Sequence, residues 1–368
     1  MKTPSKRTRP RFTAFDLFSG AGGLTLGLMK AGFHVRAAIE FDQEIARTYE
    51  KNFPNIKLLV KDIRKVSGAD LLKASDISGV DLIAGCPPCQ GFSKLTDKWD
   101  EDDDRNELVL EMARIVLELK PRVCMMENVP GLAGRGSPLL NEFEKRLRSV
   151  GYVINRSVLQ MADYGVPQSR RRLVLLAGMG FEVPLPEPTH ARIPDDSSSL
   201  EPWITVRDAL VDHRKPVALS EANAKGGPKR FNWNVTRSVK PITVQRLQFL
   251  GNGGNRLQLP QKLRPKCHKD AEEGFSNVYG RMRWDEVSPT ITSGCLTLSS
   301  GRFGHPQKNR TISVREAASL QTFPKSFRFD TKTVRVACQM VGNALPYRFA
   351  RLVSRHCMNA LIEWKPES

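Results

Sequence analysis

Short apolar runs alternate with amphipathic segments from residue 12 to about residue 180, and this alternation restricts the fold more than any other feature. Short apolar runs bounded by Gly, Pro or Asp are typical of buried strands. The six runs are FTAFDLF, VRAAIE, IKLLV, VDLIAG, RVCMMENV and RRLVLLAG. Residues 106–120 instead carry apolar side chains at helical spacing and end before Pro121, which predicts an amphipathic helix. The pattern predicts an α/β fold with a doubly wound, mostly parallel sheet, whose ligands bind beyond the carboxyl ends of the strands.

The character of the chain changes after residue 181. Residues 181–202 are rich in Pro, Ser and Asp without a helical period, which predicts a linker. The chain ends with an apolar helical stripe that begins at Phe349, and we expect this helix to pack back on the first domain. We therefore expect a basic disordered arm (1–11), a first domain (12–190 plus 335–368) and a smaller, loop-rich second domain (191–334).

Charge and cysteine content narrow the function classes. Lys and Arg number 57 against 39 Asp and Glu, a net charge of +18 that favours a polyanionic partner, nucleic acid first. A basic surface that binds nothing is the alternative. The seven cysteines form no repeating framework and fit free thiols in a reducing compartment. No apolar stretch approaches a membrane span, and the N-terminus lacks a secretory signal, so we expect no membrane partner.

The ends of the first three predicted strands carry residues that suit an adenosine-type ligand. The first strand leads into SGAGG, where glycines allow a tight turn and a close approach of a ligand to the backbone. The spacing is not G-x-G-x-x-G, which argues against a nicotinamide dinucleotide. Glu40 can accept the hydroxyls of a ribose, Phe41 can stack on a purine, and Asp62 can accept from an exocyclic amine. Each acid taken alone could equally be a helix cap or a solvated turn residue.

The fourth predicted strand ends in GCPPCQGFS, which places Cys86 and Cys89 three residues apart. Zinc needs about four ligands, and the sequence offers no second cluster. A thioredoxin-like pair should open a helix, whereas the two prolines and Gly91 favour an extended loop. The remaining interpretation is a single nucleophilic thiol that needs a partner for proton transfer. The next strands bring Glu127 and the QSRRR segment (168–172) to the same edge.

Six motifs together resemble the DNA (cytosine-5) methyltransferases, close to the bacterial restriction-modification type. They are DLFSGAGG, PPCQGFS, ENV, QSRRR, REAASLQTFP and VGNALP, in that order. The resemblance covers nearly the whole chain outside residues 190–275. It implies an S-adenosylmethionine-dependent methyltransferase (Rossmann-like) fold, with the second domain as the target-recognition domain.

The resemblance also implies a mechanism. It selects Cys89 as the nucleophile that adds to C6 of a flipped-out cytosine, so that C5 can take the methyl group of S-adenosylmethionine. Glu127 would hold the N3 and N4 edge of the base, and Arg172 would contact its carbonyl. Arg170 and Gln168 would support the same cleft. Cys86 receives no role.

Binding residues follow from the same matching. The implied cofactor contacts are Phe18, Gly20, Gly23, Glu40, Phe41, Asp62, Ile63, Pro87 and Asn343. The implied DNA contacts are Gln90, Ser93, Arg281, Arg283, Thr290, Ile291 and Arg302. The implied product is S-adenosyl-L-homocysteine, no metal is expected, and the partner is double-stranded DNA. We expect a monomer in the bacterial cytoplasm, with a cognate restriction endonuclease acting separately as a candidate partner.

Three rival functions can be stated. An RNA (tRNA) cytosine-5 methyltransferase would share the motifs, although residues 190–310 form a longer region than such an enzyme needs. A catalytically silent DNA-binding homologue is disfavoured because Cys89, Glu127 and Arg172 are all present. A nicotinamide oxidoreductase is disfavoured by the glycine spacing.

Overall fold

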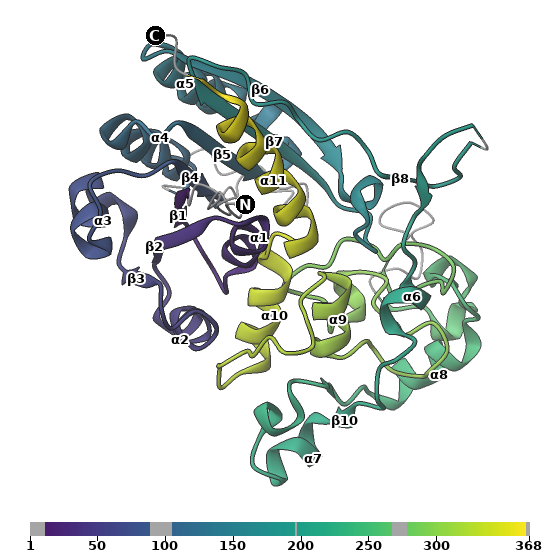
Figure 1. The fold of residues 1–368 in the computed structure, drawn as a ribbon. Coiled ribbons are helices and arrows are strands. Elements are labelled where there is room, and N and C mark those ends of the chain that lie inside the picture. The colour runs from purple at the N-terminus through teal and green to yellow at the C-terminus, as the bar shows by residue number, and fades with distance from the viewer. Residues whose placement is uncertain (1–11, 89–104, 196, 267–277, 366–368) are drawn as a thin grey trace, which may run out of the picture.

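The computed structural model describes residues 12–88, 105–195, 197–266 and 278–365, and a seven-stranded sheet forms its centre (Figure 1). The strand order is β3-β2-β1-β4-β5-β7-β6, and β7 runs antiparallel to its neighbours β5 and β6. The other neighbouring pairs are parallel, which confirms the doubly wound, mostly parallel sheet. The strands are β1 (Thr13–Leu17), β2 (His34–Glu40), β3 (Lys57–Val60), β4 (Leu82–Gly85), β5 (Val123–Asn128), β6 (Tyr152–Gln160) and β7 (Arg171–Met179).

β6 is not predicted from the sequence because this strand lies at the edge of the sheet. β6 pairs with a neighbouring strand, β7, along one edge only. Its sequence YVINRSVLQ therefore mixes buried and exposed positions and lacks a continuous apolar run. Val153, for example, is 41% exposed. The segment after β6 then reaches β7, which is inserted between β5 and β6.

Helices cover both faces of the sheet. Helices α4 and α5 pack together on one face, where Met112, Val116 and Phe143 are fully buried. Helices α1 and α11 pack on the other face, in front of the sheet in Figure 1, where Leu28 and Phe349 are fully buried. The predicted helix over residues 106–120 and the packing of the C-terminal helix on the first domain are both confirmed. The bounds are α1 (Gly23–Ala31), α2 (Gln43–Asn52), α3 (Gly68–Ser75), α4 (Leu108–Leu119), α5 (Ser137–Arg148) and α11 (Tyr347–Glu363).

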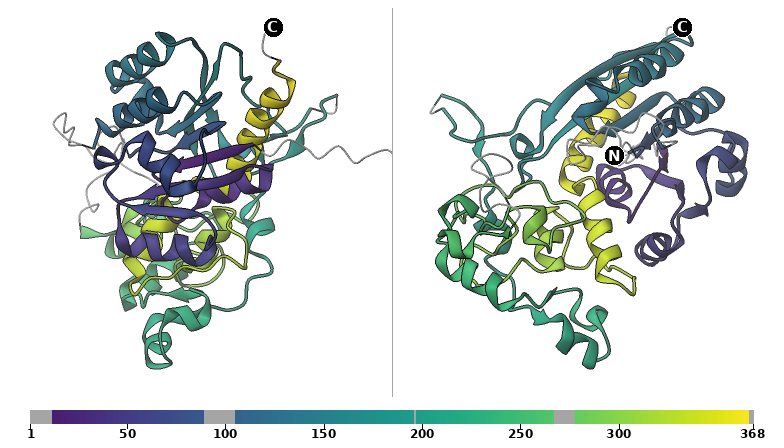
Figure 2. Two further views of the ribbon diagram at one scale, coloured as in Figure 1. Left: turned by 60° about the vertical axis from the view of Figure 1, so that its left-hand side comes forward. Right: turned by 180° about the vertical axis from the view of Figure 1, so that it is seen from behind.

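Residues 203–343 form a second region beside one edge of the sheet (Figures 1 and 2). Its regular elements are short, and long irregular segments connect them. The elements are α6 (Val206–Leu210), β10 (Val217–Ala218), α7 (Leu219–Ala224), β11 (Val235–Thr236), α8 (Pro241–Phe249), α9 (Val314–Leu320) and α10 (Val334–Asn343).

A continuous apolar core fastens this region to the sheet. Phe53 at the end of α2 contacts Phe327, whose ring lies 6.3 Å away between centroids, and Phe327 packs on Phe323 and Phe329. The two parts of the chain therefore share buried side chains. Between them, the predicted linker forms the short pair β8 (His190–Ala191) and β9 (Glu201–Pro202), which projects from the molecule in Figure 1.

Across the described residues, no helix has the length and apolar character that crossing a membrane requires.

Candidate active site

The Gly-rich turn after β1 is held by a carboxylate from the end of β2. Glu40 Oε2 accepts the N–H of Gly20 at 2.8 Å, and Glu40 Oε1 accepts the N–H of Asp42 at 2.8 Å. Phe18 and Gly20 both have positive φ, +63° and +55°, so the turn folds back tightly. Burial raises the pKa of Glu40, and the two backbone N–H groups partly offset that rise. This turn and Glu40 thus form one rigid unit at the carboxyl ends of β1 and β2.

The turn leaves room for a ligand on one side. A Cβ at Gly20 would meet no atom within 4 Å, and Phe41, which follows Glu40 in the chain, is 73% exposed. An exposed aromatic face next to an open, N–H-rich turn fits the purine and ribose of an adenosine-type ligand. Gly23 differs from this pattern, because a Cβ there would lie 2.6 Å from the carbonyl oxygen of Leu345. Its lack of a side chain serves the contact between α1 and the segment before α11.

The other predicted cofactor residues occupy varied environments. Asp62 caps the 3₁₀ turn Ile63–Lys65 and also pairs with Arg64, at 2.8 Å between Arg64 Nη2 and Asp62 Oδ2. The hydrogen bonds from Arg64, and secondly its charge, lower the pKa of Asp62. Ile63 is buried, while Asn343 is exposed at the end of α10. Pro87 is buried, and its carbonyl accepts a hydrogen bond from Asn128 Nδ2 at 3.1 Å.

Glu127 and Arg172 form the charged pair of the site. Glu127 lies near the end of β5 and Arg172 near the start of β7, where the two strands run antiparallel. Arg172 Nε lies 3.0 Å from Glu127 Oε1, with side chains 15% and 9% exposed. This contact lacks hydrogen-bond geometry, so Glu127 Oε1 is a buried acceptor without a hydrogen bond among the described groups. The charge of Arg172 compensates this carboxylate, and the oxygen keeps an acceptor position that a donor group of a ligand can use.

The cysteine motif begins next to this pair. Cys86 follows β4. Burial, and secondly the negative charge of the nearby Glu127, raise the pKa of its thiol well above the usual range. At neutral pH this thiol is therefore protonated and a poor nucleophile. The other members of the motif with predicted roles, Cys89, Gln90 and Ser93, lie outside the described residues.

The remaining residues of QSRRR join the sheet to the second region. Arg170 Nη1 donates to the carbonyl of Ile291 at 3.1 Å and its Nη2 to that of Gly342 at 3.3 Å. Gln168 accepts the N–H of Ile291 at 2.8 Å and donates to Gln321 Oε1 at 2.8 Å. We call these five residues the clasp. Burial, and secondly the charge of Arg172, lower the pKa of Arg170 to about 9, which leaves it cationic at neutral pH.

Gln321 was not recognised from the sequence as a functional residue. Its motif, REAASLQTFP, was identified, but nothing in the spacing indicates which of its side chains reaches another segment. In the structure Gln321 is fully buried and also donates to the carbonyl of Val341 at 2.6 Å. It thereby links α9, α10 and Gln168.

Arg281 does not occupy the position that a DNA contact requires, which corrects the sequence-based expectation. It is only 3% exposed. Its guanidinium donates to acceptors inside the second region, which come from Leu247, Leu250, His305, Lys308 and Asn309. Because the hydrogen-bond donors of this guanidinium are used inside the second region, Arg281 stabilises the surrounding loops and does not reach DNA phosphates.

The other predicted DNA contacts divide into buried and accessible residues. Ile291 is fully buried in the clasp, whereas Thr290 beside it donates to the carbonyl of Ser169 at 2.6 Å. Arg283 is exposed and pairs with Glu286 at 2.7 Å, and Arg302 is partly buried. In the described part of the chain, no group of His, Cys, Asp and Glu side chains is arranged to hold a metal ion.

The sheet order, the Gly-rich turn pinned by Glu40 and the charged pair at the ends of β5 and β7 define an S-adenosylmethionine-dependent methyltransferase fold. A family model described as C-5 cytosine-specific DNA methylase matches residues 12–359. The chain belongs to this family and is a DNA (cytosine-5-)-methyltransferase, as the motifs predicted.

Two curated relatives and one solved structure illustrate the similarity. The chain is 35% identical over 346 residues to the Type II methylase M.HgiDII of Herpetosiphon aurantiacus, covering 92% of this chain and 93% of that protein. It is 34% identical over 382 residues to the Type II methyltransferase M.XorII of Xanthomonas oryzae pv. oryzae, covering 98% and 87%. The structure of an Escherichia coli protein described as a prophage-encoded DNA modification methyltransferase superposes with a TM-score of 0.72 at 25% identity, covering 96% of this chain and 100% of that one.

Proposed function

We propose that this enzyme methylates C5 of a flipped-out cytosine in a specific duplex DNA sequence, with Cys89 as the covalent nucleophile. The observation that carries the proposal is the Glu127–Arg172 pair beside the start of the cysteine motif, with Glu127 Oε1 lacking a hydrogen bond. A cytosine offers matching groups, because its N4 amine donates and its O2 carbonyl accepts. Glu127 would hold the N3 and N4 edge while Arg172 contacts O2.

The chemistry follows from these positions. The Cys89 thiolate forms a bond to C6, and the electron pair displaced towards N3 is stabilised by Glu127 and Arg172. C5 becomes nucleophilic and takes a methyl group, and a base then removes the C5 proton as the Cys89–C6 bond breaks. S-adenosylmethionine, when bound, supplies the electrophilic methyl group and leaves as S-adenosyl-L-homocysteine. Since C5 and C6 lie inside the base stack of duplex DNA, the target base must leave the helix first.

The cofactor residues fit S-adenosylmethionine. The open side of Gly20, the exposed ring of Phe41 and the anchored carboxylate of Glu40 suit its adenosine. Phe18, Gly23, Ile63, Pro87 and Asn343 would line or shape the same site. Asp62 would contact the adenine through a carboxylate oxygen while it stays paired with Arg64.

Residues 191–334 would serve as the target-recognition domain, and residues 12–190 with 335–368 as the catalytic domain. This division assigns α10, which packs within the second region, to the catalytic domain. Arg283, Arg302 and Thr290 are the candidates for DNA contacts that remain accessible. The net charge of +18 supports a strong phosphate contribution to affinity. The similarity to Type II methyltransferases supports a role in protecting host DNA from a separately acting endonuclease. We also propose that the enzyme is a monomer in the bacterial cytoplasm.

Transfer of a radiolabelled methyl group to duplex DNA and to tRNA tests the proposal against the RNA-methylating alternative. We expect label on DNA cytosine with the wild type and with Glu142→Gln, which changes a partly exposed carboxylate on α5 that pairs with Arg146. Glu127→Gln should lower the rate by ~10²-fold, since one stabilising group of the transition state is lost. Label on tRNA alone, or full activity of Glu127→Gln, would contradict the proposal.

A further inference from the structure

A cleft of about 420 Å³ lies at the end of α11, outside the active site. Its lining includes Phe181, Glu182, Pro184, His356, Glu363 and Trp364. The rings of Phe181 and Trp364 stack with centroids 5.3 Å apart and form an aromatic wall. The volume falls in the range typical of ligand-binding clefts.

The cleft lies at the opposite edge of the sheet from the catalytic groups. Phe181 follows the end of β7, which runs antiparallel to β5, so this end adjoins the amino ends of the parallel strands. Arg122 directly precedes β5 and pairs with Asp81, which directly precedes β4. Cofactor and target base would bind at the carboxyl ends, so neither explains this cleft.

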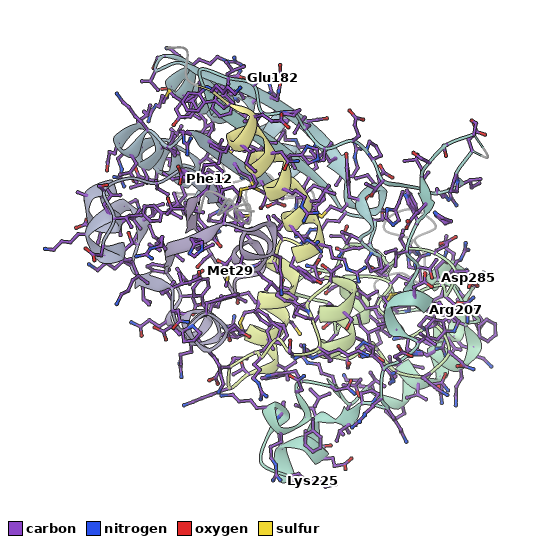
Figure 3. The ribbon with its side chains drawn as sticks, in the orientation of Figure 1. Phe12, Met29, Glu182, Arg207, Lys225 and Asp285 are labelled. Atoms are coloured by element: carbon purple, nitrogen blue, oxygen red, sulfur yellow. The ribbon has the colours of Figure 1, made fainter. Side chains whose placement is uncertain are left out.

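The charges at the cleft suit a cationic occupant. Glu182 and Glu363 are exposed at its rim, and Figure 3 labels Glu182 near the upper end of α11. Burial lowers the pKa of His356, and the nearby carboxylate of Glu187 partly offsets this shift. Carboxylates beside an aromatic wall attract Lys and Arg side chains through ion pairs and cation–π contacts. The lining thus contributes two carboxylates, and Glu182 Oε1 also accepts a hydrogen bond from Asn155 Nδ2 at 2.8 Å.

The N-terminal arm of this chain is the occupant that the surroundings favour. The described chain starts at Phe12, and the guanidinium of Arg122 lies 5.0 Å from the ring centroid of Phe12 and 5.6 Å from that of Trp364. Only the side chain of Arg122 therefore lies between Phe12, where the arm ends, and Trp364 of the aromatic wall. Residues 1–11 contain five Lys or Arg residues and no acid. At ~3.3 Å per extended residue, a few arm residues suffice to cross the cleft.

We infer that the cleft binds the basic arm of residues 1–11, and that the bound arm connects the end of α11 to the start of β1. The contact would hold the arm at the edge of the sheet opposite the DNA-binding edge. The competing role for the arm is contact with DNA phosphates, and the two roles predict different results. The inference is independent of the identity of the nucleophile.

A zero-length carbodiimide crosslink tests this contact in the full-length enzyme, because it joins Lys amines to carboxylates that they touch. We expect amide bonds from Lys2 or Lys6 to Glu182 or Glu363, identified by mass spectrometry after proteolysis. Glu182→Gln with Glu363→Gln should remove them, whereas Glu50→Gln with Glu221→Gln, which changes exposed acids elsewhere, should leave them unchanged. Arm crosslinks that spread over distant carboxylates, or that survive the first pair of changes, would overturn the inference.

A deletion cycle provides a second, independent readout. Removing residues 2–10 should lower the melting temperature by ~1–3 °C in low salt, because several exposed ion pairs are lost. The same deletion should have no effect in the Glu182→Gln, Glu363→Gln background. Loss of DNA affinity on deletion, with equal melting temperatures in both backgrounds, would assign the arm to DNA and refute the cleft.

Discussion

Substitution of Gly342 by Ala tests whether the clasp sets the geometry of the active site. Gly342 lies in α10, where a Cβ would be 2.2 Å from the carbonyl carbon of Thr292 and 2.3 Å from the backbone N of Ser293. Ordinary contacts begin near 3.4 Å, so the two backbones must separate by about 1 Å. Arg170 spans the same gap through the carbonyls of Ile291 and Gly342, and this separation would break its hydrogen bonds.

The two opposing contributions to stability can be compared. Forced overpacking costs roughly 1–3 kcal/mol, and each lost hydrogen bond costs about 1 kcal/mol more. Ala gains only about 1 kcal/mol over Gly from its helix propensity. The free energy of unfolding should therefore fall by about 2–4 kcal/mol, balancing the overpacking and hydrogen-bond losses against this gain. A displacement of about 1 Å at a catalytic group should also lower kcat by ~10²-fold.

Urea unfolding and initial methylation rates on duplex DNA measure these effects. The matched control is Gly79→Ala, since Gly79 is exposed and a Cβ there would meet no atom within 4 Å. We expect the control to match the wild type in both assays. A Gly342→Ala enzyme that is as stable and as active as the wild type would show that the close approach does not matter.

Three further predictions concern single side chains. Cys86→Ala should retain most methylation activity, because burial raises the pKa of this thiol and keeps it protonated; complete loss of activity would reassign the nucleophile. Arg281→Met should lower the melting temperature, because Arg281 is buried. Arg283→Ala should leave the melting temperature unchanged and should reduce the slope of log DNA affinity against log salt concentration by about 1. The reverse result would contradict both assignments. Burial lowers the pKa of His305 from 6.5 to about 4, so the folded state binds fewer protons than the unfolded state between these values. The contribution of neutral, buried His305 to the free energy of unfolding is therefore complete above pH 6.5 and is lost as pH falls towards 4. Free energies of unfolding from urea denaturation should show a loss of about 3 kcal/mol between pH 6.5 and pH 4 in the wild type and not in His305→Asn.

The strands and helices that could be predicted are those whose burial leaves a one-dimensional signal. β4 and β5 are fully buried, so they appear as apolar runs, and α4 shows its buried stripe at helical spacing. β6 could not be predicted in this way because one of its edges and part of its surface face solvent. Edge strands lose the continuous pattern on which the prediction relies.

The candidate site shows a similar division. Glu127 and Arg172 were expected in one cleft because both lie at strand ends, and the structure pairs them at 3.0 Å. Arg281 was expected on the surface, since nothing local distinguishes an arginine that faces DNA from one that donates to carbonyls of distant loops. Gln321 is comparable, because its partner Gln168 lies 153 residues away in the chain. Such contacts depend on tertiary packing and leave no periodic signal.

Covalent trapping tests the central claim most directly. With S-adenosylmethionine and duplex DNA in which every cytosine carries fluorine at C5, the final proton loss cannot occur, so the Cys89–C6 bond should persist. Denaturing electrophoresis and peptide mass spectrometry should then find the DNA attached to Cys89 in the wild type and in Cys86→Ser, and no adduct in Cys89→Ser. An adduct that survives in Cys89→Ser, or one located on Cys86, would contradict the account.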